Sequence, residues 1–491
     1  MSRSVTNKAV QGVLWTYFSF AGGKLLLFVA TIILARLLAP AEFGQVALAL
    51  LVVGYIEAVG DFGVGSALIY EREKPEEAAN IAFLVSVATG FLWFGIAYAA
   101  AAPIADFFNE PQAVSLFRVM AAVFVISAFG NTHDALLRRD LQFKKRVVPD
   151  LAQAIVKGSV SVALALAGWG VWSLVWGQIV GAVATTLTLW LVKPWRPGRE
   201  ASWTTARRML GYGKHIVSVN MISAVVHDAD FVIVGRTLGS AALGFYSMAY
   251  RSQEFFITTI VWVVGKVAFP VYAQLREDMA ALRSAFLATL RYLSLVTLPV
   301  GFGLAVVGGL FIEVFYGETW AAAALPLQVL AASGALRSLG SHAGDIYKAI
   351  GRPEILTKLG VLRAVVIVPA MIWGASFGIV GVAVAQLVVT AASTLLNLYV
   401  AGRILSLPVT ALLREFRSGL VASAAMVGML SLVLPASGDL PAIVRLVFAV
   451  LAGALVYFGM LYLVGRETFD EASQAIRTAL RRGPPAPVAS T

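Results

Sequence analysis

Apolar segments long enough to cross a lipid bilayer follow one another along almost the whole chain. A membrane-spanning helix needs roughly 20 apolar residues, and fourteen runs of about this length are separated by short breaks with charged residues, Pro or Gly. The runs are residues 12–38, 43–70, 78–102, 112–133, 148–168, 171–192, 215–238, 243–269, 292–315, 323–347, 359–377, 380–402, 416–434 and 441–464. Because 59% of the residues are hydrophobic and only 13% are charged, the chain is too apolar for a soluble protein. We predict an all-α integral membrane protein with about 14 transmembrane helices.

The basic residues give the orientation of these helices. Lys and Arg lie in every second break, whereas the alternate breaks 103–111, 317–319 and 435–440 hold none. Basic loops stay on the cytoplasmic side, so we predict that both termini are cytoplasmic. The net charge of +11 then reflects orientation and contact with anionic membrane lipids, and nucleic acid is not an expected partner.

An internal repeat is visible in the apolar runs. Residues 35–44 align with 235–244 at a separation of 200 positions, and residues 170–187 align with 378–395 at a separation of 208. Since both copies start on the same side, the repeat is parallel, and it predicts two six-helix bundles around a central cavity plus two extra C-terminal helices. The predicted parts are an N-terminal bundle (1–192), a cytoplasmic linker with an interfacial helix (193–214), a C-terminal bundle (215–402), helices 13 and 14 (403–464) and a cytoplasmic tail (465–491).

The composition limits the chemistry. The chain has no Cys and only four scattered His, which excludes disulfides and thiolate catalysis and gives little basis for a zinc site. No Walker motif is present. We expect no cofactor and no ATP hydrolysis, and the sequence does not settle whether a metal binds.

Several basic residues fall inside the apolar runs, where a charge costs about 2.5 to 3.5 kcal/mol and usually faces a wet cavity or a partner. Lys24 is either a cavity cation or the partner of Asp61 or Asp230, and Arg251 either binds an anion or pairs with Glu254. The other candidates for the cavity are Lys157, Arg337 and Arg118, although Arg118 could also extend to the outer interface.

Acidic residues in the same runs are candidates for ion coupling. Glu57 and Asp61 are four residues apart and share a helix face, where two carboxylates could hold a proton or a cation; alternatively, Asp61 stabilises a local break in the helix. His227 and Asp230 are three apart, and they form either a buried structural pair or a protonation switch.

Three segments carry a resemblance to a known family. Residues 34–44, 61–69 and 136–143 resemble the bacterial polysaccharide transporters, which are lipid-linked oligosaccharide flippases of the multidrug/oligosaccharidyl-lipid/polysaccharide exporter superfamily. The resemblance implies a multi-pass protein of the bacterial cytoplasmic (inner) membrane that takes part in surface or exopolysaccharide biosynthesis.

The resemblance also implies a transported molecule and a mechanism. An undecaprenyl-diphosphate-linked oligosaccharide repeat unit would move from the cytoplasmic to the outer leaflet by alternating access, driven by a gradient of H⁺ or Na⁺, with other polysaccharide assembly proteins as partners. By helix position, Lys24 and Arg251 correspond to the cavity cations of related lipid II flippases. Two alternatives remain, a cation-coupled multidrug exporter of the same superfamily and a membrane glycosyltransferase or polymerase.

Overall fold

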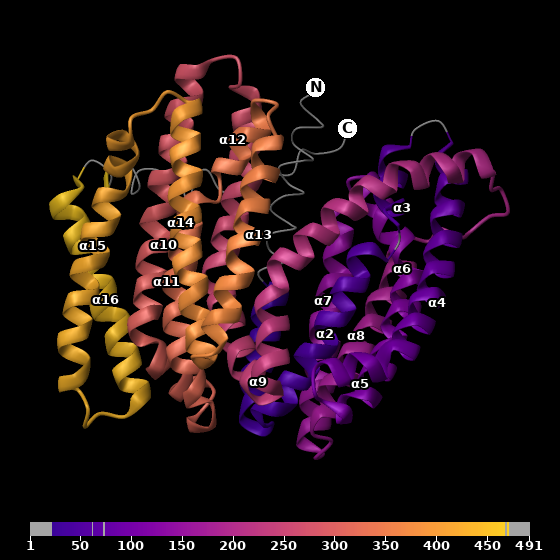
Figure 1. The fold of residues 1–491 in the computed structure, drawn as a ribbon, viewed down its shortest axis with the longest axis horizontal. Helices are drawn as coiled ribbons and strands as arrows, with labels where there is room; N and C mark the ends of the chain where they lie inside the picture. The colour runs from indigo at the N-terminus through magenta and orange to yellow at the C-terminus, as the bar shows by residue number, and fades with distance from the viewer. Residues whose placement is uncertain (1–21, 61, 72–73, 467–468, 471–491) are drawn as a thin grey trace, which may run out of the picture. The chain divides into compact units, whose positions relative to one another are not determined.

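The chain is described by a computed structural model over residues 22–60, 62–71, 74–466 and 469–470, and for residues 214–216 and 218–227 only the backbone is described. This part of the chain is helical and contains no β-strand (Figure 1). Residues 22–37 form a first helix. The helices that follow are α2 (Pro40–Val59), α3 (Val64–Tyr70), α4 (Pro75–Phe107), α5 (Val114–Met120), α6 (Ala122–Arg139), α7 (Phe143–Leu166), α8 (Val171–Val192), α9 (Trp203–Gln274), α10 (Met279–Phe315), α11 (Ala324–Gly340), α12 (Ala343–Ala349), α13 (Glu354–Ala375), α14 (Gly378–Ile404), α15 (Val409–Ala436) and α16 (Ala442–Val464).

Twelve helical segments within the described residues are long and apolar enough to cross a membrane. The all-α membrane architecture predicted from the apolar runs is therefore confirmed. The count differs from fourteen for two reasons. The first helix is described only from residue 22, and the seventh and eighth predicted helices both lie in the 72-residue α9, which bends at Gly239. The left-handed φ of 83° at Gly239 is accessible to glycine at no steric cost.

The described residues divide into two compact units, neither of which is continuous in sequence. Unit 1 comprises Met1–Met248, Phe315–Ala323 and Met371–Val382, and unit 2 comprises Ala249–Val314, Ala324–Ala370 and Ala383–Thr491. In unit 1, helices α2 to α8 lie side by side (Figure 1). The domain boundaries expected from the repeat stay a prediction.

Unit 2 includes the last two helices, α15 and α16, which pack on each other (Figure 1). The hydroxyl of Tyr457 on α16 donates a hydrogen bond of 2.7 Å to the carbonyl oxygen of Leu295 on α10. Phe416 of α15 belongs to a buried apolar cluster with Phe286 and Leu290 of α10. The two C-terminal helices are thus part of the core of unit 2.

The sequence repeat has a structural counterpart within unit 1, at four residues that we call the repeat junction: Pro40, Gly44, Ser240 and Gly244. A methyl group added at Gly44 would lie 1.7 Å from the carbonyl oxygen of Ser240, and one added at Gly244 would lie 1.9 Å from that of Pro40. Because Pro40 corresponds to Ser240 and Gly44 to Gly244, each copy contacts the other through the same positions. Such reciprocal contacts are what a two-fold axis produces, so they support duplication.

The two arginines of the repeated motif lie beside the junction, and both contact the end of a long helix. Arg36 donates from Nε to the carbonyl oxygen of Phe315, the last residue of α10, at 3.1 Å. Its equivalent, Arg236, places its guanidinium 5.4 Å from the ring centre of Phe107, the last residue of α4. An arginine that binds the final carbonyl of a helix satisfies a group that the helix itself leaves unpaired.

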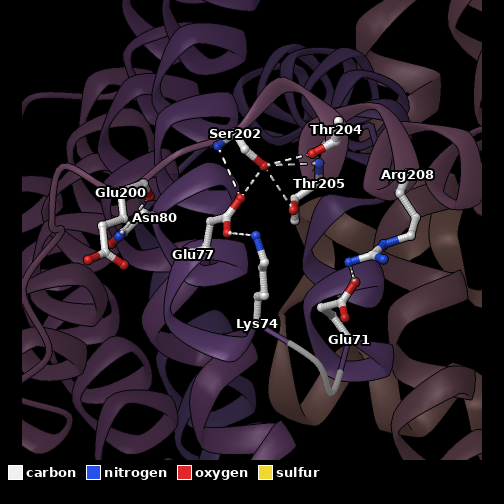
Figure 2. A network of polar contacts seen from close by, with 9 residues as sticks. All are labelled: Glu71, Lys74, Glu77, Asn80, Glu200, Ser202, Thr204, Thr205 and Arg208. Carbon is white, nitrogen blue, oxygen red and sulfur yellow. Dashed lines mark hydrogen bonds and ion pairs between the residues drawn. The ribbon is translucent and has the colours of Figure 1, made fainter.

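The segment that connects α8 to α9 is hydrogen-bonded to α4 of unit 1 at several positions. The amide of Gly198 donates to the Asn80 Oδ1 at 2.8 Å, and the Asn80 Nδ2 donates to the carbonyl oxygen of Glu200 at 3.0 Å. The Ser202 amide donates to the Glu77 Oε1 at 3.1 Å, and the Lys74 ammonium lies 3.0 Å from the other oxygen of Glu77 (Figure 2). Side chains at the start of α4 thus hold the backbone of the connecting segment.

The interfacial helix expected within the linker 193–214 differs from the observed one. The helix begins at Trp203 and continues into α9, because the backbone of 198–202 is used in contacts with α4. Met209 and Leu210 pack on an apolar cluster that includes Leu68 of α3 and Leu136 of α6. Met209 and Leu210 therefore face protein, whereas Trp203 is 75% exposed.

Asp140, in the turn between α6 and α7, anchors the start of the connecting segment. Its carboxylate lies 2.6 Å from the Lys193 ammonium and 3.2 Å from the Arg139 Nε. Partial burial raises the pKa of Asp140, but the hydrogen bonds and charges of Lys193 and Arg139 outweigh burial and hold that pKa below its ordinary value. At neutral pH this carboxylate is ionised and paired.

Candidate functional site

Unit 1 has polar space between its helices. Two adjoining cavities, of about 360 and 240 Å³, share Glu57 of α2 and Ser127, Asn131 and Asp134 of α6 in their walls; together we call them the bundle cavity. The three α6 residues are spaced at i, i+4 and i+7, so they line one face of that helix. Space lined by two carboxylates, an amide and a hydroxyl inside an apolar bundle is suited to water or a small cation.

Asp134 is held by two arginines. Its Oδ1 lies 2.6 Å from the Arg146 Nε at the start of α7, and its Oδ2 pairs with Arg138, one turn further along α6. Both arginines line the cavity as well. The two arginines neutralise the charge of Asp134. Of the two carboxylates shared by both cavities, Glu57 is therefore the candidate to bind a proton or a cation.

Lys157 on α7 is connected to the bundle cavity through α8. Its ammonium donates to the Gln178 Oε1, and Gln178 lines the smaller cavity together with Asp150 and Gln153. The two helices approach closely at this level, since a methyl group at Gly181 would lie 2.9 Å from the Lys157 Cβ.

The other residues predicted for ion coupling lie outside the bundle cavity or outside the described residues. Asp230 is buried, and its carboxylate accepts hydrogen bonds of 2.9 Å from the Tyr246 hydroxyl and from the Phe231 amide. Asp61 and the side chain of His227 lie outside the described residues. Both alternatives for His227 and Asp230, the buried structural pair and the protonation switch, stay predictions.

The remaining predicted cations lie in both units. In unit 1, Lys24 is half-buried on the first helix, which lies beside α7: a methyl group at Gly23 would be 3.7 Å from the Ala154 Cβ. Arg118 is exposed, with its guanidinium 5.0 Å from the Tyr98 ring centre; this contact with an exposed aromatic ring fits the interfacial alternative.

In unit 2, Arg251 is exposed on α9. The Arg337 Nη2 donates to the Thr258 hydroxyl at 3.2 Å, and no carboxylate in the part of the chain that the structure describes lies within ion-pair distance of Arg337. The assignment of these five cations to one binding site stays a prediction.

Sequence reasoning missed Asn131, Asp134 and Arg146 as site residues. The predicted fourth run ends at residue 133, which places Arg138 and Arg146 in a basic loop. In the structure α6 extends to Arg139 and α7 begins at Phe143. The signal available in the sequence was the i,i+4 spacing of Asp134 and Arg138.

The described residues include no group of three or more His, Asp or Glu side chains placed to hold a metal ion. The walls of the bundle cavity include the carboxylates of Glu57, Asp134 and Asp150, the cations of Arg138 and Arg146, and several neutral oxygens. Because Asp134 pairs with both arginines, we consider Glu57 the candidate for transient binding of a proton or a monovalent cation.

Replacement of Asp134 should destabilise the bundle. In an Asp134→Ala variant, Arg138 and Arg146 would lose a common acceptor, which should lower the free energy of unfolding by about 1 to 3 kcal/mol. Thermal unfolding of the purified protein in detergent measures this loss. The matched control is Asp140→Ala, which removes another two-cation pair at a more exposed position and should cost about 1 kcal/mol or less; equal losses would contradict the role of Asp134.

The fold is shared with solved transporters. The lipid II flippase MurJ in an inward closed conformation superposes with a TM-score of 0.73 at 14% identity, over 93% of this chain and 99% of that chain. An inward-facing multidrug resistance transporter of the MATE family gives a TM-score of 0.66 at 17% identity, over 78% of this chain and 94% of that chain. At such identities the likeness establishes the fold alone.

Sequence relatives come from glycan biosynthesis. TuaB, a teichuronic acid biosynthesis protein of Bacillus subtilis, is 26% identical over 72% of this chain and 73% of its own length. WzxC, a lipopolysaccharide biosynthesis protein of Escherichia coli, is 24% identical over 81% of each chain. ExoT, a succinoglycan biosynthesis transport protein of Rhizobium meliloti, is 27% identical over 81% of each chain.

A family model described as "Polysaccharide biosynthesis protein" matches residues 33–325. The match includes the motif around Gly44, its repeat around Gly244 and the whole bundle cavity. It covers more than half of the 491 residues, and this chain belongs to the polysaccharide biosynthesis protein family.

Proposed function

We propose that this protein is a flippase that moves an undecaprenyl-diphosphate-linked oligosaccharide repeat unit from the cytoplasmic to the outer leaflet of a bacterial inner membrane. It would work by alternating access, with both termini in the cytoplasm, and supply the unit for a surface or exopolysaccharide. The observation that carries the proposal is the family match over residues 33–325. It is supported by relatives named for polysaccharide biosynthesis and transport and by the fold shared with a lipid II flippase.

The physical problem of this transport is the diphosphate. An anionic headgroup does not enter hydrocarbon unaided, because the cost of removing a charge from water is large. Cations in a hydrated passage would replace its hydration, while the lipid tail stays in the bilayer. Lys24, Arg251, Lys157 and Arg337 are the candidates; Arg337 is supported by its neutral hydroxyl partner, which leaves its charge available for an anion.

The energy for directional transport would come from a gradient of H⁺ or Na⁺. Glu57 is the proposed binding group, since it lies in both parts of the bundle cavity. An ion that binds one conformation more tightly than the other shifts the population toward that conformation. Expected partners are anionic lipids and other polysaccharide assembly proteins.

The test is transport by the purified protein in liposomes. An undecaprenyl-diphosphate-linked oligosaccharide placed in one leaflet should appear in the other, and an imposed proton or sodium gradient should accelerate its movement. Transport of organic cations without movement of the lipid would favour a multidrug exporter, whose fold this chain also shares. Elongation of the glycan by the purified protein would favour a glycosyltransferase or polymerase.

A Glu57→Gln variant should lose its response to the ion gradient. Glutamine keeps the size and polarity of the side chain but cannot ionise. The ratio of the transport rates with and without the gradient should therefore fall to about 1, while gradient-independent movement persists. The same liposome assay, run with and without the gradient, measures the ratio. The matched control is Glu76→Gln, an exposed acid at the start of α4; full stimulation of Glu57→Gln would exclude Glu57 as the coupling group.

A further inference from the structure

We infer that Tyr70 and Tyr212 form a stacking platform for a sugar ring of the lipid-linked glycan; this inference rests on the proposed function and names the part of the substrate bound here. The two rings lie parallel, with centres 5.2 Å apart and an interplanar angle of 10°. Tyr70 is 71% exposed and Tyr212 is 40% exposed. Large aromatic surface is normally buried, so a stacked pair left open needs an explanation.

The platform is part of a concave site within unit 1. Tyr70 is the last residue of α3, and Tyr212 lies in the first part of α9. Both line a cavity of about 640 Å³, whose wall also includes Ser66, Glu71 and Arg208. A concave site of this size, with aromatic surface and a few polar groups, is the usual form of a small-ligand site.

The charges of the cavity match a sugar better than a diphosphate. Glu71 and Arg208 are the charged residues in its wall, and they pair with each other, with 2.7 Å between the Glu71 Oε2 and the Arg208 Nη2 (Figure 2). A diphosphate requires an excess of positive charge, which a neutralised pair does not supply. The pair does offer both an acceptor and several N–H donors, as sugar hydroxyls require.

The aromatic pair supplies the other half of sugar recognition. A pyranose ring has hydroxyls around its edge and C–H groups on its faces, so a face can lie flat against an aromatic ring through weak C–H contacts and apolar burial. Tyrosine provides this surface at little entropic cost, because it has few rotatable bonds. A ring on the platform would place its hydroxyls toward Ser66 and the Glu71–Arg208 pair.

The backbone around the platform is fixed, which distinguishes it from two surface tyrosines that meet by chance. A methyl group at Gly213 would lie 1.9 Å from the Phe62 carbonyl oxygen, and one at Gly63 would lie 2.6 Å from the Gly213 Cα. Met209, one turn before Tyr212, is buried in the apolar cluster of α3, α4 and α6. Because both tyrosines are attached to closely packed backbone beside a buried cluster, the two rings are held together in the arrangement that a ligand would meet.

The alternative occupant of the platform is the membrane interface, where tyrosine is common. An experiment with two lipids separates the possibilities. Proteoliposomes receive either undecaprenyl-diphosphate-linked oligosaccharide or undecaprenyl diphosphate without sugar. A Tyr70→Ala, Tyr212→Ala double variant should move the sugar-bearing lipid about threefold to tenfold more slowly and the sugar-free lipid at the wild-type rate.

Two further variants serve as controls. The Tyr70→Phe, Tyr212→Phe variant keeps both rings and should retain most of the transport of the sugar-bearing lipid. Trp203→Ala removes an exposed aromatic residue from the same helix outside the cavity and should affect neither lipid. Equal slowing of both lipids by the alanine variant, or the same slowing by Trp203→Ala, would overturn the sugar platform in favour of a structural or interfacial role.

A binding measurement keeps this inference separate from the proposed function. With 3-fluorotyrosine at position 70 in the full-length protein in nanodiscs, the fluorine resonance should shift on addition of the sugar-bearing lipid and not on addition of the sugar-free lipid. This selective shift supports the platform even if the liposomes show no transport, in which case the flippase proposal fails instead. No shift with saturating sugar-bearing lipid overturns the platform.

Discussion

Replacement of Gly44 by alanine is expected to lower the free energy of unfolding by about 3 kcal/mol or more, at the upper end of the range for overpacked sites. The added methyl group would lie 1.7 Å from the Ser240 carbonyl oxygen and 2.5 Å from its carbonyl carbon. These are backbone atoms, so no rotation of a side chain can relieve the overlap. Thermal unfolding of the purified variant in detergent, followed by circular dichroism, measures the effect.

The chain offers a matched control in the same helix. Gly54 is also in α2, but a methyl group there has open space within 4 Å. Gly54→Ala should be neutral or stabilise the protein by up to about 1 kcal/mol, because alanine favours a helix over glycine. Gly244→Ala should repeat the effect of Gly44→Ala, since its methyl group would meet the Pro40 carbonyl oxygen at 1.9 Å. Similar unfolding temperatures for all three variants would contradict the close contact at the repeat junction.

The repeat junction shows how far the sequence predicts the fold. The match of residues 35–44 to 235–244 could be found because it recurs at a constant separation, and the apolar runs specify membrane helices by length alone. The contact of Gly44 with Gly244 could not be derived in this way. Two glycines at equivalent positions are compatible with many arrangements, and only the three-dimensional structure shows that each lies against the other copy.

The candidate site was predicted less completely, for a related reason. Glu57 could be identified because a carboxylate inside an apolar run is conspicuous. Asp134 does not stand out in the sequence, because it lies near charged residues at a predicted loop, where charge is ordinary. Its partner Arg146 lies twelve residues further on, in α7, and the periodicity of a single helix does not indicate which residues of the next helix it will contact.

The stacking of Tyr70 on Tyr212 illustrates the limit more strongly. The two residues belong to separate helices, α3 and α9, and neither stands out in sequence among many aromatic residues. Their meeting depends on the connecting segment, which Asn80 and Glu77 hold against α4 (Figure 2). Contacts made by backbone atoms carry little sequence signal, so the sequence does not show that an anchored coil precedes the helix that begins at Trp203.

A Lys24→Ala variant should be almost inactive in the movement of the lipid-linked oligosaccharide while it inserts and folds normally. If Lys24 binds the diphosphate, its loss removes a charge-assisted interaction of about 1.5 to 3 kcal/mol, which corresponds to a rate lower by about 10- to 150-fold. The liposome assay measures this loss, and the unfolding temperature shows whether the fold is retained. Removal of a cation from an apolar helix should not by itself hinder insertion, since the charge is the costly feature there.

Charge and position can be separated with two further variants. Lys24→Arg keeps the charge and should retain part of the activity, although a guanidinium differs from an ammonium in shape and reach. Lys266→Ala removes an exposed lysine that lies 4.7 Å from the Trp262 ring centre, and it should transport normally. If a folded Lys24→Ala protein transports at the wild-type rate, the diphosphate must be held by the other basic residues.

The next variant to test is then Arg337→Gln. The described contact of Arg337 is with a neutral hydroxyl, so the loss of its charge leaves no described carboxylate without its partner.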